Sequence, residues 1–173
     1  FVKPEERRMP LRRFVAMMED PALCDGVPYL SHQNDSLRQQ FDAISGDCPP
    51  MIDFAAAAFG NDPDAVNLWI GDERSVSSCH KDHYENCYCV LRGEKHFWLL
   101  PPSDAPFLHE RCFRTATHRY DIASEEWVAD VEDDAINWVD CDVTKPEDLK
   151  IMTTTASARR PIKVVLRAGS MLY

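Results

Sequence analysis

The chain contains 173 residues, which is about the size of one domain and enough to form a single hydrophobic core. Hydrophobic residues make up 45% and no apolar run approaches the ~18–20 residues of a membrane-spanning helix, so the composition argues against a membrane-embedded or largely disordered protein. The 29 acidic and 19 basic residues leave a net charge of −10, which disfavours nucleic-acid phosphates and favours basic protein segments or small molecules as partners.

The N-terminal part, residues 1–60, is expected to be mainly helical. Residues 10–18 form an amphipathic pattern with apolar residues at i, i+3, i+4 and i+7. A second helix is expected over residues 37–44, and an alanine-rich third over 53–59, which ends at Gly60. The apolar residues of the first pattern are Leu11, Phe14, Val15 and Met18.

Residues 61–173 are expected to form a β-rich core within one domain that spans residues 1–173. Short runs of β-forming residues alternate with turn signals at ~8–12-residue spacing, which predicts an all-β barrel or sandwich. An acidic stretch over residues 121–142 contains Trp127 and Trp138 and reads as a surface insertion. The expected strands cover 27–30, 66–70, 76–79, 87–91, 96–100, 162–166 and 171–173.

A histidine and a carboxylate, His80 and Asp82, are separated by one residue. On a strand, positions i and i+2 face the same side, so both side chains would converge on one metal ion. They would supply two ligands of a 2-His-1-carboxylate triad, which suits non-haem Fe(II) and O2 chemistry. The pattern also arises by chance, and His80 is then a structural histidine. A pair of His80 with His83 would suit a helix, which the β-forming surroundings disfavour.

Lys95 begins an apolar strand after the turn at residues 92–94. A lysine there is commonly a strand-edge residue with its ammonium in water. Beside an iron site, an inward-pointing ammonium would instead bind the distal carboxylate of 2-oxoglutarate as a charge-assisted pair.

The stretch from Asp64 to Asp104 resembles the core of a Jumonji-C domain. The resemblance is carried by the segments NLWIG, HKDHYEN, GEKHF and PPSD, and it becomes looser over the wider range from Tyr29 to Tyr173. It implies a mainly β fold with N-terminal helices, namely a double-stranded β-helix of the cupin-like jelly-roll type.

The resemblance also implies a cofactor and a cosubstrate. His80 and Asp82 resemble the first two Fe(II) ligands, and Lys95 resembles the lysine that anchors 2-oxoglutarate. Three further residues match polar positions of the cosubstrate pocket: Asn86, Ser77 and Tyr29. For Tyr29 and Ser77, a buried tyrosine bonded to a backbone carbonyl and a solvated strand serine are the commoner situations.

A third iron ligand is not found by this resemblance. In the family it is a histidine just beyond the strand that resembles residues 167–173, where this chain stops, so we expect the ligand and the final strands of the barrel to be missing. His96 alternates with Lys95 and should face outward. The other candidates are poor substitutes in an N-terminal segment or in an irregular stretch after Pro102: His32, His109 and His118.

The resemblance implies an Fe(II)- and 2-oxoglutarate-dependent dioxygenase that uses O2 for (3S)-lysyl hydroxylation of a GTPase-type protein. Two alternatives stay open. One is a divalent-metal endopeptidase acting on histone tails, although the chain contains no HExxH motif. The other is an inactive cupin-like interaction module, because the third metal ligand is absent. We expect the 173 residues alone to be inactive.

Seven cysteines without a CxxC pair or a secretion signal are expected to be reduced thiols of a cytoplasmic or nuclear protein. The expected partner is a protein that carries a target lysine, such as a GTPase or a histone. Neither membrane association nor direct nucleic-acid binding is expected, and a homodimer is left open.

Overall fold

The computed structural model describes residues 1–145, 147–148 and 160–173. Contacts divide the chain into two compact units, of which one comprises Arg7–Val76 and the other combines Phe1–Glu6 with Ser77–Tyr173. The expectation of a single domain with a helical part up to residue 60 stays a prediction. No helix among the described residues is long and apolar enough to cross a membrane.

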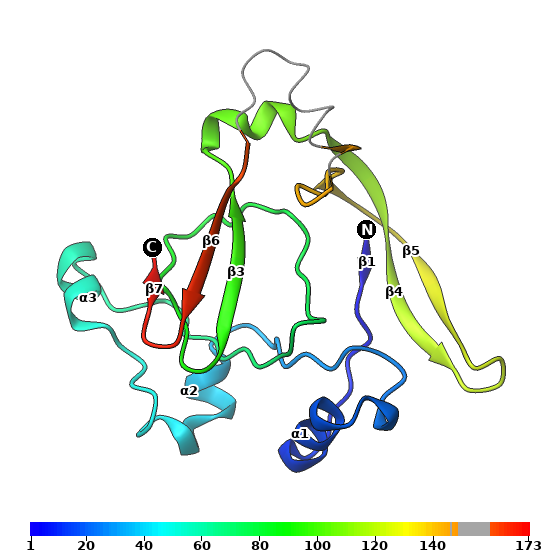
Figure 1. Ribbon diagram of the computed structural model, residues 1–173, viewed down its shortest axis with the longest axis horizontal. Helices are drawn as coiled ribbons and strands as arrows, with labels where there is room; N and C mark the ends of the chain where they lie inside the picture. The colour runs from blue at the N-terminus through cyan, green and yellow to red at the C-terminus, as the bar shows by residue number, and fades with distance from the viewer. Residues whose placement is uncertain (146, 149–159) are drawn as a thin grey trace. The chain divides into compact units, whose positions relative to one another are not determined.

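The unit formed by residues 7–76 contains the helices expected from the sequence (Figure 1). Helix α1 buries Phe14 and Met17, whereas Leu11 and Val15 of the expected apolar stripe stay exposed. The helical elements are α1 (Leu11–Glu19), η1 (Pro21–Leu23), α2 (Ser36–Gln40), η2 (Asp42–Ile44) and α3 (Asp53–Phe59).

Of the helices expected over residues 37–44 and 53–59, the first is interrupted and the second ends where it was predicted to end. The helix expected over 37–44 is interrupted at Phe41, whose backbone leaves the helical region, so that α2 and the 3-10 turn η2 are separate. Helix α3 ends as expected at Gly60, which adopts a left-handed φ of 75° that glycine reaches without steric cost.

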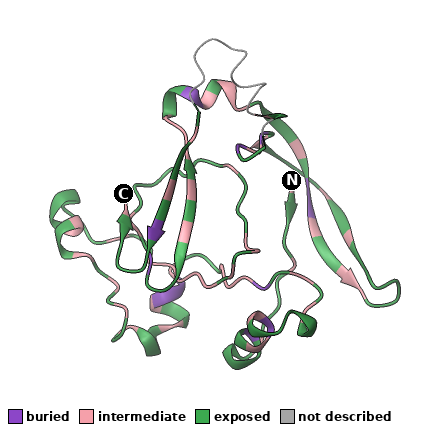
Figure 2. Ribbon diagram, in the orientation of Figure 1, coloured by how far each residue is buried: buried purple, intermediate pink, exposed green. Residues whose placement is uncertain are grey.

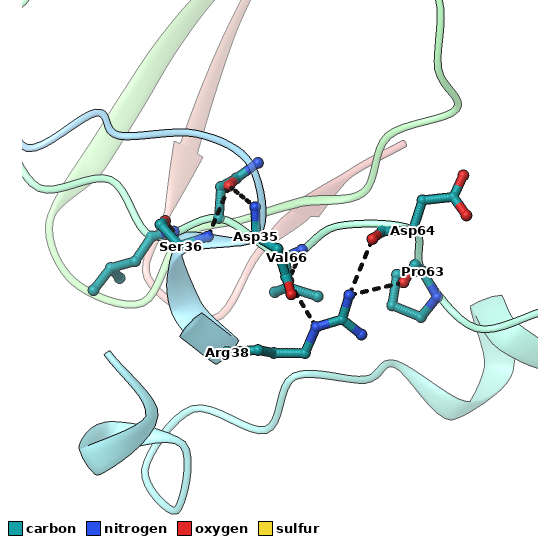
Figure 3. A network of polar contacts seen from close by, with 8 residues as sticks. Asp35, Ser36, Arg38, Pro63, Asp64 and Val66 are labelled. Atoms are coloured by element: carbon teal, nitrogen blue, oxygen red, sulfur yellow. Dashed lines mark hydrogen bonds and ion pairs between the residues drawn. The ribbon is translucent and has the colours of Figure 1, made fainter. Parts of the chain in front are cut away.

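A polar network joins the start of α2 to residues 63–68 (Figure 3). Asn67 Oδ1 accepts hydrogen bonds from the backbone N–H groups of Asp35 (3.0 Å) and Ser36 (3.2 Å). Ser36, which is fully buried, accepts a bond from the Leu68 N–H through its hydroxyl oxygen (3.1 Å). Asp35 Oδ1 accepts bonds from the Val66 N–H (2.9 Å) and from Arg38 Nε (2.6 Å).

This network corrects the prediction of a strand over residues 66–70. The backbone N–H groups of Val66 and Leu68 bond to side chains instead of to a neighbouring strand. What remains of the expected strand pairing is one antiparallel bridge between Leu30 and Ile70. Side chains therefore accept the backbone hydrogen bonds that a neighbouring strand would otherwise accept, and the strand-forming residues do not form a sheet.

The unit formed by residues 1–6 and 77–173 is rich in strands, as expected. Its described strands form three sheets: a three-stranded sheet in the order β1-β4-β5, an antiparallel pair β2-β7 and an antiparallel pair β3-β6. The elements are β1 (Val2–Lys3), β2 (Tyr88–Cys89), β3 (Glu94–Leu99), η3 (Pro102–Phe107), β4 (Glu110–Asp121), β5 (Glu126–Val139), β6 (Ile162–Arg167) and β7 (Met171–Leu172).

The acidic stretch expected to be a surface insertion is largely strand β5. It pairs with β4 along a long antiparallel hairpin, from Glu110–Val139 to Asp121–Glu126, with a register shift between Arg114 and Ala116. His118 accordingly lies in β4 and not in an irregular stretch. The strand was not predicted because neither face of this hairpin is continuously buried, so the sequence lacks the apolar alternation that identifies a strand. Most residues of β5 are exposed, in keeping with the expected surface position.

Strand β3 has one half-buried face and one exposed face. Lys95, Phe97 and Leu99 alternate with exposed residues, and Lys95 is paired in register with Leu166 of β6, which is only 7% exposed (Figure 2). His96 faces outward as predicted, where its Nε2 lies 2.8 Å from Glu94 Oε1. The alternation therefore directs Lys95 toward the interior side of the ladder.

Candidate metal centre

The segment that carries His80 and Asp82 belongs to no helix or strand of the described part of the chain. Residues 76–87 are neither helix nor strand, which corrects the expected strand at 76–79 and the expected strand setting of the HxD pair. The two side chains nevertheless converge, with His80 Nε2 lying 3.8 Å from Asp82 Oδ2.

The imidazole of His80 is oriented by its own loop. His80 Nδ1 lies 2.7 Å from the backbone oxygen of Ser78, a geometry that suits an N–H donating to the carbonyl. With the proton on Nδ1, the lone pair of Nε2 is available to a metal ion, and Asp82 Oδ2 lies 3.8 Å from this nitrogen. The side chains of His80 and Asp82 are 39% and 64% exposed, so both ligand atoms are accessible from solvent.

The donor pair fits a divalent metal ion. Two cis ligand atoms, each at ~2.1 Å from a metal, would be about 3.0 Å apart, so the observed 3.8 Å requires a shift of less than ~1 Å by an exposed carboxylate. A neutral imidazole and a carboxylate are also the mixed ligands that ferrous sites use. Among the described residues, no group of three or more His, Cys, Asp or Glu side chains is placed to hold a metal.

The neighbours of the pair anchor the loop. Cys79 packs against the buried cluster of Cys141 and Val143, and burial raises the pKa of the Cys79 thiol. Burial likewise raises the pKa of Cys141, to about 11. These thiols therefore stay protonated and serve packing rather than metal binding. Lys81 Nζ lies 3.3 Å from Glu110 Oε2, at the start of β4.

Lys95 lies on the half-buried face of β3, and the exposed Asn86 lines a pocket beside that face. The Lys95 ammonium is partly removed from water, and this burial lowers its pKa. Asn86 lines a pocket of about 250 Å³ together with Phe97 and Leu99, which share the face of β3 that carries Lys95. The structure thus brings Asn86 to the strand face expected for the cosubstrate. The pocket is completed by Tyr88, Leu172 and Tyr173.

The other two expected cosubstrate residues, Ser77 and Tyr29, are not among the described residues that line the pocket of Asn86. Ser77 is exposed, and no hydrogen bond joins its side chain to another residue of the described part. Tyr29 belongs to the unit formed by residues 7–76, where it is half-buried against Gly71, and burial raises its pKa. The cosubstrate roles of Ser77 and Tyr29 stay predictions.

Two residues beside His80, Ser78 and Trp138, are not indicated by any pattern in the sequence. Trp138, near the end of β5, donates a hydrogen bond from Nε1 to Ser78 Oγ at 3.1 Å. Its ring stacks on the imidazole of His80, with the ring centroids 5.8 Å apart and the planes at 18°. No local signal connects these residues, because they are 60 positions apart in the chain and Trp138 lies in the stretch read as an insertion.

Comparison with known proteins establishes the class to which this fold and site belong. The chain matches the family described as "Cupin-like domain" over residues 1–173. Together with the relatives named below, this match shows that the chain belongs to the cupin-like Jumonji-C family, which confirms the expected family and the mainly β jelly-roll class.

Three relatives illustrate the similarity. The chain is 36% identical over 176 residues to the human bifunctional peptidase and (3S)-lysyl hydroxylase JMJD7, covering 100% of this chain and 54% of that protein. It is 38% identical over 165 residues to the Arabidopsis thaliana lysine-specific demethylase JMJ32, with 87% and 46% covered. The Dictyostelium discoideum JmjC domain-containing protein E is 34% identical over 187 residues, with 100% and 53% covered. The chain therefore spans about half the length of these relatives.

Proposed function

We propose that this chain contributes the metal-binding and cosubstrate-binding residues of an Fe(II)- and 2-oxoglutarate-dependent oxygenase. The observation that carries the proposal is the convergence of His80 Nε2 and Asp82 Oδ2 in a Jumonji-C chain. Bound Fe(II) would supply the activation of O2 at the expense of 2-oxoglutarate. His80 and Asp82 would hold the metal, and the third protein ligand would come from outside the described residues.

The cosubstrate is assigned to Lys95 and Asn86. The Lys95 ammonium would bind the distal carboxylate of 2-oxoglutarate, and its partial burial strengthens such a pair relative to one in water. The amide of Asn86, a residue that lines the neighbouring pocket, would hydrogen-bond to the same molecule. We keep Ser77 and Tyr29 as further proposed contacts with this cosubstrate.

For the substrate, we propose the side chain of a lysyl residue on a protein. The names of two relatives, a (3S)-lysyl hydroxylase and a lysine-specific demethylase, both involve lysine, and the net charge of −10 favours a basic partner. Hydroxylation at the (3S) position of a GTPase-type protein in the cytoplasm or nucleus is the specific form of this proposal. A metal-dependent peptidase remains the second candidate, supported by the name of the human relative.

The test of the metal centre uses Mn(II), titrated as the metal alone and detected by its electron paramagnetic resonance signal. Asp82→Ala should weaken Mn(II) binding by at least about tenfold, because the imidazole alone lacks the anionic oxygen ligand. His83→Ala is the matched control and should bind like the unsubstituted protein. Equal Mn(II) affinity in Asp82→Ala and the unsubstituted protein would contradict the proposed centre.

The test of the cosubstrate site compares two lysines of the same ladder. Lys95→Met should raise the Kd for 2-oxoglutarate at least about tenfold, since a partly buried carboxylate would lose its partner. Lys163→Met is the control, because Lys163 lies on the opposite face with its ammonium 5.1 Å from the Trp98 ring centroid. An unchanged Kd in Lys95→Met removes Lys95 from the site.

The reaction itself is tested by mass spectrometry of a lysine-containing protein incubated with the holoprotein, Fe(II), 2-oxoglutarate and O2. A gain of one oxygen supports hydroxylation, and loss of a methyl group indicates demethylation. Cleavage of the substrate chain without use of 2-oxoglutarate would favour the peptidase.

A further inference from the structure

The indole of Trp138 contacts the candidate metal ligand His80 in two ways. Its ring lies nearly parallel to the imidazole, at a centroid distance of 5.8 Å that is typical of offset stacking. Its Nε1–H donates to Ser78 Oγ, and Ser78 is the residue whose backbone oxygen lies 2.7 Å from His80 Nδ1. One side chain of β5 therefore touches both the ring and the residue that holds the ring nitrogen.

We propose that Trp138, acting with Ser78, is a positioning residue that fixes the orientation and the tautomer of His80 for metal binding. This inference rests on the proposed function, because it gives His80 the role of a metal ligand. Stacking limits rotation of the imidazole about its Cβ–Cγ bond. The bond to Ser78 holds the loop so that the Ser78 carbonyl accepts the Nδ1–H, which leaves the Nε2 lone pair available to the metal.

The position of His80 in the fold explains why its side chain needs this support. His80 is 39% exposed on a segment without strand pairing, so neither a ladder nor a packed core fixes its side chain. Trp138 lies on the long hairpin opposite Arg111 and is also contacted by the ring of Phe1, at a centroid distance of 4.5 Å. The indole of Trp138 is therefore held in place by its own strand and by the ring of Phe1. Through its contacts with Ser78 and His80, it restrains the loop that carries them.

The experiment combines metal affinity with a measurement that needs no metal. The ¹⁵N chemical shifts of the neutral His80 ring in the metal-free protein report which nitrogen carries the proton, and Mn(II) titration reports affinity. The His80 signal is assigned by its loss in His80→Asn. Trp138→Leu should shift the His80 ring from the Nδ1–H tautomer to a mixture of tautomers. It should also weaken Mn(II) binding about tenfold, because the loss of a residue that supports a metal ligand commonly has an effect of this size.

Three further variants separate positioning from stability. Trp138→Phe keeps a stacking ring and should retain more Mn(II) affinity than Trp138→Leu. Ser78→Ala removes only a surface hydroxyl and should show a smaller tautomer change in the same direction, so it tests the idea even where Trp138→Leu fails to fold. Trp127→Leu is the matched control, because Trp127 is 41% exposed on the same strand and contacts His118 and Tyr120 instead.

The outcomes distinguish this inference from the proposed function. An unchanged tautomer in Ser78→Ala and in every folded Trp138 variant would overturn the positioning role, whatever the stability of those variants. If the unsubstituted protein binds no Mn(II), the proposed metal centre fails, and the tautomer measurement alone then decides whether Trp138 orients His80. A change in Trp127→Leu as large as in Trp138→Leu also overturns the inference, since it would indicate a general effect of the hairpin.

Discussion

Replacing Asn67 by alanine should destabilise the unit formed by residues 7–76. The Asn67 amide oxygen accepts hydrogen bonds from two consecutive backbone N–H groups, those of Asp35 and Ser36, at the start of α2. Asp35 adopts a left-handed φ of 68°, a conformation that needs local hydrogen bonds to persist in a residue other than glycine. Asn67→Ala removes the acceptor for both donors and leaves the strained backbone without this support.

The expected loss follows from the burial of these donors. A helix N-cap acceptor contributes about 0.5–2 kcal/mol, and a buried donor that loses its partner costs about 1–3 kcal/mol. Both bonds are partly buried, so water replaces part of the loss at each donor. We therefore expect Asn67→Ala to lower the free energy of unfolding by about 2 kcal/mol, which is a large fraction of a typical domain stability.

Equilibrium unfolding in urea measures this change. At an m-value of about 2 kcal/mol per molar, the midpoint should fall by about 1 M while the slope stays constant. The matched control is Asn61→Ala, since Asn61 donates to the backbone oxygen of Asp62 in an exposed turn; it should change stability by less than about 0.5 kcal/mol. Equal midpoints for Asn67→Ala and Asn61→Ala would refute the reasoning.

Three other substitutions test packing and electrostatics. Gly71→Ala should lower the unfolding free energy by about 1–3 kcal/mol in urea titrations, because its Cβ would lie 2.7 Å from Cδ2 of the Tyr29 ring. Leu166→Ala should lower it by about 2–5 kcal/mol in the same assay, since the side chain is only 7% exposed in the β3–β6 ladder. Hydrogen bonds, first that from Lys3, lower the pKa of Glu132 from 4.5 to about 2. The folded state therefore binds fewer protons than the unfolded state between these values, and stability should fall as the pH falls through this range; Glu132→Gln should flatten that dependence in pH-resolved unfolding.

Each of these substitutions has a control on the same chain. Gly46→Ala meets no atom within 4 Å, and Val165→Ala removes a side chain that is 36% exposed, so both should be nearly neutral. Asp133→Asn changes a fully exposed carboxylate and should leave the acid sensitivity intact. A control as destabilising as its partner variant would contradict the expected packing effects. Full pH dependence in Glu132→Gln would contradict the expected role of the Glu132 carboxylate.

Local patterns were enough to predict several parts of this protein. The helix ending at Gly60 follows from a glycine that stops an alanine-rich segment, and the outward direction of His96 follows from alternation with Lys95. The convergence of His80 and Asp82 also follows from their spacing, although the expected strand did not form. These features depend on residues within a few positions of one another, where backbone geometry alone relates the side chains.

Tertiary structure alone decided the parts that depend on distant residues. Val66 and Leu68 bond to the side chains of Asp35 and Ser36, more than 30 positions away, so strand-forming composition did not produce a strand. The acidic residues of β5 became a strand because β4 supplied a full ladder, and Trp138 reached the loop of His80 through that hairpin. Neither partner carries a local mark of the other, because a hydrogen bond or ring contact across the fold depends on how the chain closes, and composition and periodicity describe only neighbouring residues.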